Sequence, residues 1–155
     1  MKKLLLALLG LTIFVNAADN KVEYPENYRD WSHIKSMVIN DAHSLAASFE
    51  GIHHIYANKK AKKGLITNDY EKGAKFVFDL LEAKRTKETT TEGKRKFIGV
   101  MEYDSKKYEK TGNWGYEAFA GDSKTNRVVE DGGVSCFQCH IAVKNKSYVW
   151  TENRK

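Results

Sequence analysis

The sequence predicts an α+β fold, mainly an antiparallel β-sheet with short helices at its start and a helix or loop near its C-terminus. The clearest observation is an alternation of side chains with period two in residues 73–84, which is typical of a strand. One face of this strand carries large apolar residues, namely Phe76, Phe78 and Leu80. The other face carries Lys75, Val77 and Asp79. The polar segment 86–94 contains a glycine near its end and predicts a hairpin loop to a partner strand at 95–103.

The other elements follow from shorter patterns. Residues 24–31 predict a short helix, because Pro25 suits a first helical turn. Further strands are expected at 33–40, 48–58 and 113–121. In the strand 48–58 one face would carry Phe49, Gly51, His53 and Ile55, and the other Ile52, His54 and Tyr56. Several strands with polar connections favour an antiparallel sheet.

The chain has 155 residues, which suits one domain. Lys2 and Lys3 precede an apolar run at 4–15, and small residues follow, so residues 1–17 predict a secretory signal peptide. Twelve apolar residues fall short of the roughly 20 that a spanning helix needs. We therefore expect an exported, periplasmic protein whose single domain occupies residues 18–155, with no membrane span after processing.

The basic charge does not indicate a nucleic-acid surface. Removal of Lys2 and Lys3 lowers the formal net charge from +6 to +4. The remaining basic residues are dispersed, apart from a local run at 58–64, whereas nucleic-acid sites cluster them with aromatic residues. That run is interpreted as a solvated helix or loop, and no nucleic-acid partner is expected.

Both cysteines of the chain lie in one motif, Cys-Phe-Gln-Cys-His, at residues 136–140. A disulfide is one alternative in an exported protein. A thioredoxin-like motif needs a βαβ unit around it, and a structural zinc site needs four ligands. Covalent haem attachment uses all three residues: Cys136 and Cys139 add to the vinyl groups, and His140 ligates the iron. The motif therefore predicts one covalent haem c.

The other axial position distinguishes classes of haem protein. Small electron-transfer cytochromes carry the motif early and a methionine ligand downstream, but no methionine follows His140 here. Met37 and Met101 lie within strand patterns and are interpreted as packed core residues. The four-helix cytochromes c′ require long segments with helical periodicity, which the middle of this chain lacks.

Five segments together resemble the cytochrome P460 and cytochrome c′-beta family. They are "YPENYRDW", "FEGIHHIYAN", "GAKFVFDLLEAK", "TGNWGYEAF" and "CFQCHIAVKNKSYVWT", in this order along nearly all of the expected mature chain. The resemblance implies an antiparallel sheet, a homodimer, and a haem c near the C-terminus. It also implies that Cys136 and Cys139 attach the haem and that His140 is the proximal ligand.

The resemblance further implies two branches. P460 members carry a lysine in the strand matching residues 74–80; it links covalently to the haem, and these members oxidise hydroxylamine. The c′-beta members carry phenylalanine there and bind diatomic gases. Phe78 stands at this position, Lys75 would lie on the opposite strand face, and Phe49 matches a second phenylalanine that caps the iron. The apolar face that Phe76 shares with Phe78 suits an inward wall.

Three polar residues are further candidates. His53 stands where P460 members carry an arginine, so it is a candidate distal residue that donates a hydrogen bond to a bound ligand or ligates the iron; a histidine at the pocket rim is the alternative. Glu130 and Asp131 precede the haem motif where P460 enzymes place a proton-transfer carboxylate. A turn at this "EDGG" segment is the alternative.

These features predict a gas-binding cytochrome with five-coordinate iron under phenylalanine, taking nitric oxide or carbon monoxide. Two alternatives remain: a hydroxylamine- or nitric-oxide-oxidising enzyme, and a periplasmic electron carrier. Either would act with a periplasmic redox partner.

Overall fold

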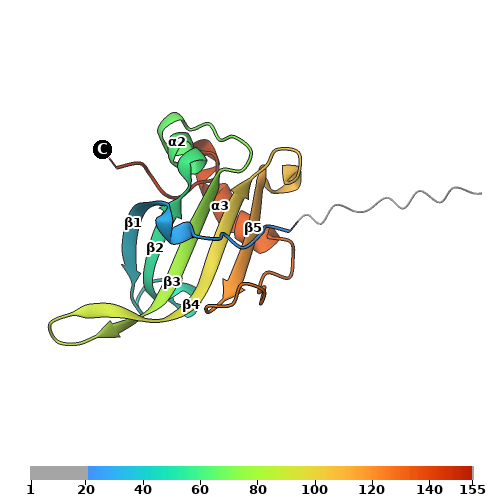
Figure 1. Cartoon of the computed structure of the whole chain (residues 1–155). Helices are drawn as coiled ribbons and strands as arrows, with labels where there is room; N and C mark the ends of the chain where they lie inside the picture. Colours follow the sequence, from blue (N-terminus) through green and yellow to red (C-terminus); the bar gives the residue numbers. More distant parts are fainter. Residues whose placement is uncertain (1–20, 155) are drawn as a thin grey trace, which may run out of the picture.

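The computed structural model describes residues 21–154. The predicted signal peptide at 1–17 lies outside the described residues. The described part is organised around one five-stranded antiparallel sheet in the order β1-β2-β3-β4-β5 (Figure 1). The strands are β1 (Ser32–Ile39), β2 (Gly51–Ala57), β3 (Lys75–Arg85), β4 (Thr90–Tyr103) and β5 (Trp114–Ala120). Each strand pairs with its sequence neighbour, which confirms the predicted α+β class.

The helices are short and lie between strands or near the C-terminus. They are η1 (Tyr28–Asp30), α1 (Ala46–Phe49), α2 (Lys59–Thr67), η2 (Glu109–Thr111), α3 (Val134–His140) and η3 (Ile141–Lys146). The side chain of Asn58 caps α2 by accepting a hydrogen bond from the Ala61 amide at 2.9 Å. The basic run 58–64 is therefore the start of a capped helix. No described helix is long and apolar enough to cross a membrane.

One face of the sheet is covered by the N-terminal segment, and we call it the N-terminal face. Figure 1 shows this segment crossing the strands before it enters β1. Val22 and Tyr28 pack there against buried strand residues, including Val77, Ile98 and Phe119. Burial of these apolar surfaces supplies the main stabilisation of this face.

A buried carboxylate also ties the N-terminal segment to the sheet. Asp79 in β3 has no exposed surface and accepts hydrogen bonds from Tyr28 at 2.8 Å and Arg29 at 2.9 Å. Its other oxygen accepts one from Arg95 in β4 at 2.7 Å. Both carboxylate oxygens are thus paired, which a buried charge requires.

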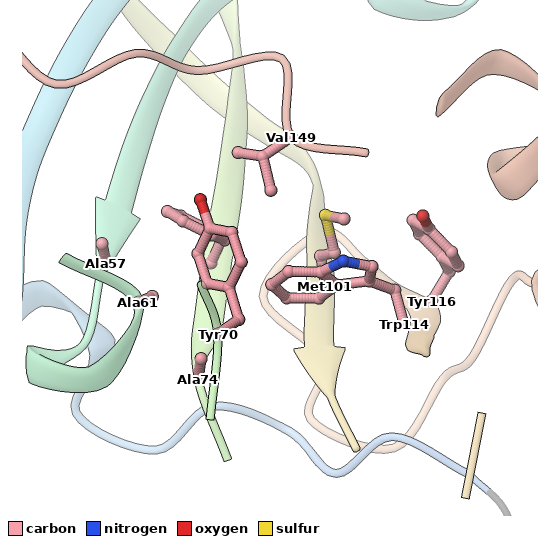
Figure 2. Close-up of a cluster of buried hydrophobic side chains, with 9 residues drawn as sticks. Ala57, Ala61, Tyr70, Ala74, Met101, Trp114, Tyr116 and Val149 are labelled. Atoms are coloured by element: carbon pink, nitrogen blue, oxygen red, sulfur yellow. The ribbon is translucent and has the colours of Figure 1, made fainter. Parts of the chain in front are cut away.

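The opposite face carries α3, and we call it the α3 face. Its core cluster contains Phe76, Met101, Trp114 and Tyr116 from the strands, together with Tyr70 and Val149. Figure 2 shows most of these side chains converging between α2, the sheet and the C-terminal segment. Cys136 and Phe137 of α3 pack against this cluster, so the sheet core directly supports the motif helix.

Four sequence predictions need correction. Phe49 ends α1 and is not part of the strand, because pairing of β2 with β1 begins at Gly51. The hairpin loop is shorter than 86–94, since β4 begins at Thr90 and pairs with β3 from there. The helix expected over 24–31 is only the three-residue turn η1. Met37 is 41 % exposed and not a core residue, whereas Met101 is buried as predicted.

The strands expected at 33–40, 73–84 and 113–121 are confirmed to within two residues, whereas the strand expected at 95–103 begins five residues earlier, at Thr90. The register pairs His53 with Leu80 and Ile55 with Phe78, so these four side chains share the α3 face. His54 pairs with Asp79 and lies on the N-terminal face. The sequence therefore assigned the two faces of β2 and β3 correctly.

Candidate functional site

The helix α3 brings the three residues of the motif together. Cys136, Cys139 and His140 are spaced i, i+3 and i+4, so they lie on one side of the helix. Cys136 is half-buried and Cys139 is exposed, and both are free cysteines. The arrangement leaves two thiols and one imidazole directed to a common side of α3.

The imidazole of His140 is oriented by a single hydrogen bond. Its Nδ1 lies 2.6 Å from the carbonyl oxygen of Tyr148. A carbonyl can only accept, so Nδ1 carries the hydrogen and Nε2 keeps its lone pair. Metal-bound histidines commonly donate their second ring nitrogen to a carbonyl in this way. His140 is thus prepared to ligate a metal through Nε2.

The acceptor carbonyl is held by an unusual backbone conformation. Ser147 and Tyr148 have φ values of 52° and 64°, in the left-handed region that non-glycine residues rarely occupy. The indole of Trp114 in β5 donates a hydrogen bond to the Ser147 carbonyl at 2.9 Å. The Tyr148 backbone amide donates a hydrogen bond to the Val143 carbonyl at 3.1 Å. Such strain persists only where surrounding contacts enforce it, and here it aims a carbonyl at His140.

Burial shifts the pKa values of two motif residues. Burial lowers the pKa of His140, although the hydrogen bond with the Tyr148 carbonyl acts in the opposite direction. The imidazole is therefore neutral at neutral pH, as a metal ligand must be. Burial, with the nearby Asp131, raises the pKa of the Cys136 thiol. Cys136 is accordingly not an activated thiolate of the kind found in thiol enzymes.

Next to α3, the sheet presents a partly exposed apolar surface. Tyr116 of β5 contacts the His140 ring edge-on, with centroids 5.0 Å apart. Two residues further along β5, Ala118 pairs with Gly99 of β4, which pairs with Phe78 of β3. These three are only half-buried. Small residues beside a large aromatic ring therefore form a half-buried apolar surface on the α3 face.

Three phenylalanines and one histidine cluster at the edge of this apolar surface, and we call this cluster the aromatic wall. The ring of Phe78 lies 5.8 Å from Phe49 and 5.8 Å from Phe97, measured between centroids. His53 stacks on Phe78 at 4.5 Å with 29° between the ring planes. The structure therefore brings Phe49, His53 and Phe78 together, as the sequence predicted.

Phe97 is a wall residue that the sequence analysis did not identify. It comes from β4, lies on the same face as Gly99, and pairs with Leu80. The sequence signal that could have identified Phe97 is its position in the predicted strand 95–103, two residues before Gly99 and therefore on the same strand face. The contact depends on the β3–β4 register, which the sequence pattern alone does not specify.

His53 is the one polar member of the aromatic wall. It is only 3 % exposed, and its Nδ1 has no hydrogen-bond partner among the described residues. Burial, with Lys35 and His54 contributing positive charge, lowers its pKa to about 4. The imidazole is therefore neutral at neutral pH.

Comparison with known protein families identifies the family of this chain. The Cytochrome P460 family model matches residues 25–151. This chain belongs to the cytochrome P460 family. No curated protein matches the sequence. Family membership makes haem the expected cofactor and indicates a c-type haem protein, and cytochromes P460 are generally exported.

The site of this P460-family chain fits a haem. Two thiols and a lone-pair nitrogen converge on one side of α3, beside a half-buried apolar surface of the kind that a porphyrin contacts. The buried hydroxyl of Tyr116, next to His140, has no partner among the described residues. Two buried polar groups without partners, Tyr116 and His53, thus lie on the α3 face, on the different strands β5 and β2.

Lysine is absent from the Phe78 position, and Lys75 is directed elsewhere. Lys75 pairs in register with Glu102, and its ammonium lies 3.4 Å from the Glu102 carboxylate. This pair belongs to the N-terminal face, because Lys75 is three residues from Phe78 on a regular strand. The prediction that Lys75 and Phe78 lie on opposite faces is confirmed.

The remaining candidates have structural contacts of their own. Phe76 is packed in the core cluster, 5.9 Å from Tyr70 and 6.0 Å from Trp114 between centroids. Asp131 accepts hydrogen bonds from the amides of Gly133 and Ser135 at 3.0 and 2.8 Å, and so caps the start of α3. These bonds, from Ser135 first, lower the pKa of Asp131. A proton-transfer role for Asp131 or the exposed Glu130 remains a prediction.

Proposed function

We propose that this chain is an exported gas-binding cytochrome of the P460 family, with one covalently attached haem c and an open distal side. Its ligands would be neutral diatomic molecules such as nitric oxide and carbon monoxide. A haem iron held by one imidazole supplies an open coordination position for such ligands. His140 would provide this imidazole, and the aromatic wall would cover the opposite side.

Covalent attachment is supported by the chemistry of α3. Cys136 and Cys139 are unpaired thiols spaced by one helical turn, and His140 lies beside them. Each thiol would add across one vinyl group, so two thioether bonds form and no oxidant is required. The Tyr148 carbonyl would hold the ligating imidazole in one orientation.

The observation that carries the gas-binding assignment is the opposite placement of Phe78 and Lys75. Phe78 occupies the aromatic wall, 4.5 Å from His53 between ring centroids. Lys75 lies on the N-terminal face and is paired with Glu102. No lysine therefore stands at the position from which the enzyme branch would form its link to the haem.

The composition of the wall favours neutral ligands. Phe49, Phe78 and Phe97 offer no hydrogen bonds, and a charged ligand would lose its hydration without compensation. A small neutral molecule loses little hydration and needs little space. The wall would therefore exclude water and bulky or charged ligands more strongly than diatomic gases.

Peptide mapping of the purified haem protein tests the assignment. We expect haem to remain on the peptide containing Cys136 and Cys139, with no bond to any lysine. A ferrous spectrum should show the single broad visible band of a five-coordinate haem. A haem–lysine bond, including one to Lys75, would instead assign the chain to hydroxylamine oxidation. Sharp α and β bands would assign it to electron transfer.

We also infer export to the periplasm and assembly as a homodimer. Residues 1–17 have the composition of a signal peptide, and export matches the general habit of the family. Electrons would come from a periplasmic redox partner. N-terminal sequencing of the secreted protein and its mass in solution test both inferences: a start near Ala18 and twice the protomer mass are expected.

A further inference from the structure

In the described part of the chain, three buried polar atoms lack a hydrogen-bond partner, namely His53 Nδ1 and the hydroxyls of Tyr108 and Tyr116, and His53 is the one that belongs to the aromatic wall. Asp79 is paired with Tyr28, Arg29 and Arg95. Glu117 and Asp104 are paired with Arg127 and Lys72, at 2.7 and 2.9 Å. His53 is buried to the same extent, yet its Nδ1 has no partner. Buried polar groups in folded proteins are normally satisfied, so an exception calls for a physical reason.

The neighbours of His53 cannot supply the missing bond. Its cross-strand partners on the α3 face are Met37 and Leu80, and its ring stacks on Phe78. Lys35 of β1 and the adjacent His54 are the charged or titratable groups that act on it. Burial disfavours the protonated imidazole most, and both neighbours act in the same direction, so His53 is neutral and offers one N–H and one lone pair.

The stacking places the His53 ring directly beside Phe78. The two rings are 4.5 Å apart and nearly parallel, so the imidazole lies next to the residue proposed to cap the distal space. Phe49 and Phe97 hold Phe78 from its other sides. A ligand that reaches Phe78 therefore comes within range of His53.

We propose that His53 is a specificity-determining residue that donates a hydrogen bond to a polar diatomic ligand in the distal space, favouring nitric oxide over carbon monoxide. Nitric oxide accepts charge from ferrous iron more readily than carbon monoxide and is the better hydrogen-bond acceptor. A single donor in an otherwise apolar wall acts on this difference, because the phenylalanine side chains around it offer the ligand no other hydrogen bond. This inference rests on the proposed gas-binding function.

Dissociation rates of both gases from the ferrous haem protein test the proposal. Replacement His53→Leu removes the donor and keeps an apolar side chain; His53→Gln restores an N–H donor. We expect His53→Leu to speed nitric oxide release about fivefold, the factor for roughly 1 kcal/mol of hydrogen bonding. Carbon monoxide release should change by less than about twofold, because a weak acceptor gains little from the donor. His53→Gln should return the ratio of the two rates towards the wild-type value.

The adjacent histidine provides a matched control. His54 lies on the opposite face, where its ring contacts Ser36 at 2.6 Å and Glu92 at 2.5 Å. His54→Gln should leave both dissociation rates unchanged. Infrared spectroscopy of the carbon monoxide complex gives a second readout. Loss of a donor should raise the C–O stretching frequency in His53→Leu and leave it unchanged in His54→Gln.

The outcomes separate the two proposals. Equal rate ratios and equal stretching frequencies in wild type and His53→Leu would overturn the role of His53 while gas binding stands. Failure of the wild-type haem protein to bind either gas would overturn both. A ratio of nitric oxide to carbon monoxide dissociation rates that rises in His53→Leu and recovers in His53→Gln supports both.

Discussion

Replacement of Phe78 by alanine is the most direct perturbation of the aromatic wall. Phe78 is half-buried in the described structure. A fully buried phenylalanine costs roughly 3–5 kcal/mol when truncated to alanine, so about 2 kcal/mol is expected here. The loss would come mainly from the ring contacts with Phe49, Phe97 and His53.

The same change should speed entry of ligands. For a ligand to pass, the Phe78 ring must move away from Phe49 and Phe97. An aromatic pair contributes about 0.5–1.5 kcal/mol, so separating two pairs costs roughly 1–3 kcal/mol. Removing this barrier corresponds to a rise of roughly 5- to 150-fold in the association rate.

Stopped-flow mixing of carbon monoxide or cyanide with the haem protein measures this rate, and urea unfolding measures the stability. Val77→Ala is a matched control, because Val77 is fully buried on the N-terminal face. It should destabilise the fold by a similar amount and leave the association rate unchanged. Equal association rates in wild type and Phe78→Ala would show that Phe78 does not cap the distal space.

Three further predictions concern attachment, stability and pH. The double variant Cys136→Ala, Cys139→Ala should release its haem into acidic organic solvent, and retained haem would contradict thioether attachment. Asp79→Asn should lower the free energy of unfolding by about 3 kcal/mol, because it breaks a buried ion-paired network. Asp122 also pairs with Arg95, but its side chain is 80 % exposed. Asp122→Asn should therefore lower the free energy of unfolding by at most about 1 kcal/mol, measured by the same urea unfolding. Because burial lowers the pKa of His53 to about 4, the unfolded chain binds more protons between pH 6.5 and 4, and stability falls as the pH falls through this range. Wild type should lose roughly 3 kcal/mol more than His53→Gln between pH 7 and pH 4, measured by urea unfolding, and parallel pH curves would contradict the neutral buried imidazole.

The sequence predicted the parts of the fold that depend on local periodicity. Alternation in residues 73–84 assigned Phe78 and Lys75 to opposite faces, and the structure confirms this. The spacing of Cys136, Cys139 and His140 predicted their common placement without reference to the sheet. Both inferences need only the geometry of a single element.

The wrong predictions concern contacts between elements. Phe49 was assigned to a strand because it continued the alternation, but the alanine-containing segment before it forms the turn α1. Its ring still reaches Phe78, now from a helix. Met37 fits the apolar alternation, yet β1 is an edge strand and leaves it exposed. The alternation of side chains along one strand does not show whether that strand lies at the edge of the sheet, nor which conformation the segment between two strands adopts.

The candidate site was least predictable where it depends on backbone outside the strands. No pattern indicated that the Tyr148 carbonyl orients His140, since this requires two consecutive left-handed residues. Those residues are enforced by Trp114, which belongs to the core cluster beneath α3. The same indole therefore stabilises the α3 face and helps to position the His140 imidazole that we propose as the haem ligand. It follows that the two faces of the sheet have separate tasks. The N-terminal face pairs its buried Asp79 with Tyr28, Arg29 and Arg95, whereas the α3 face keeps a half-exposed apolar surface and a histidine with an unpaired ring nitrogen.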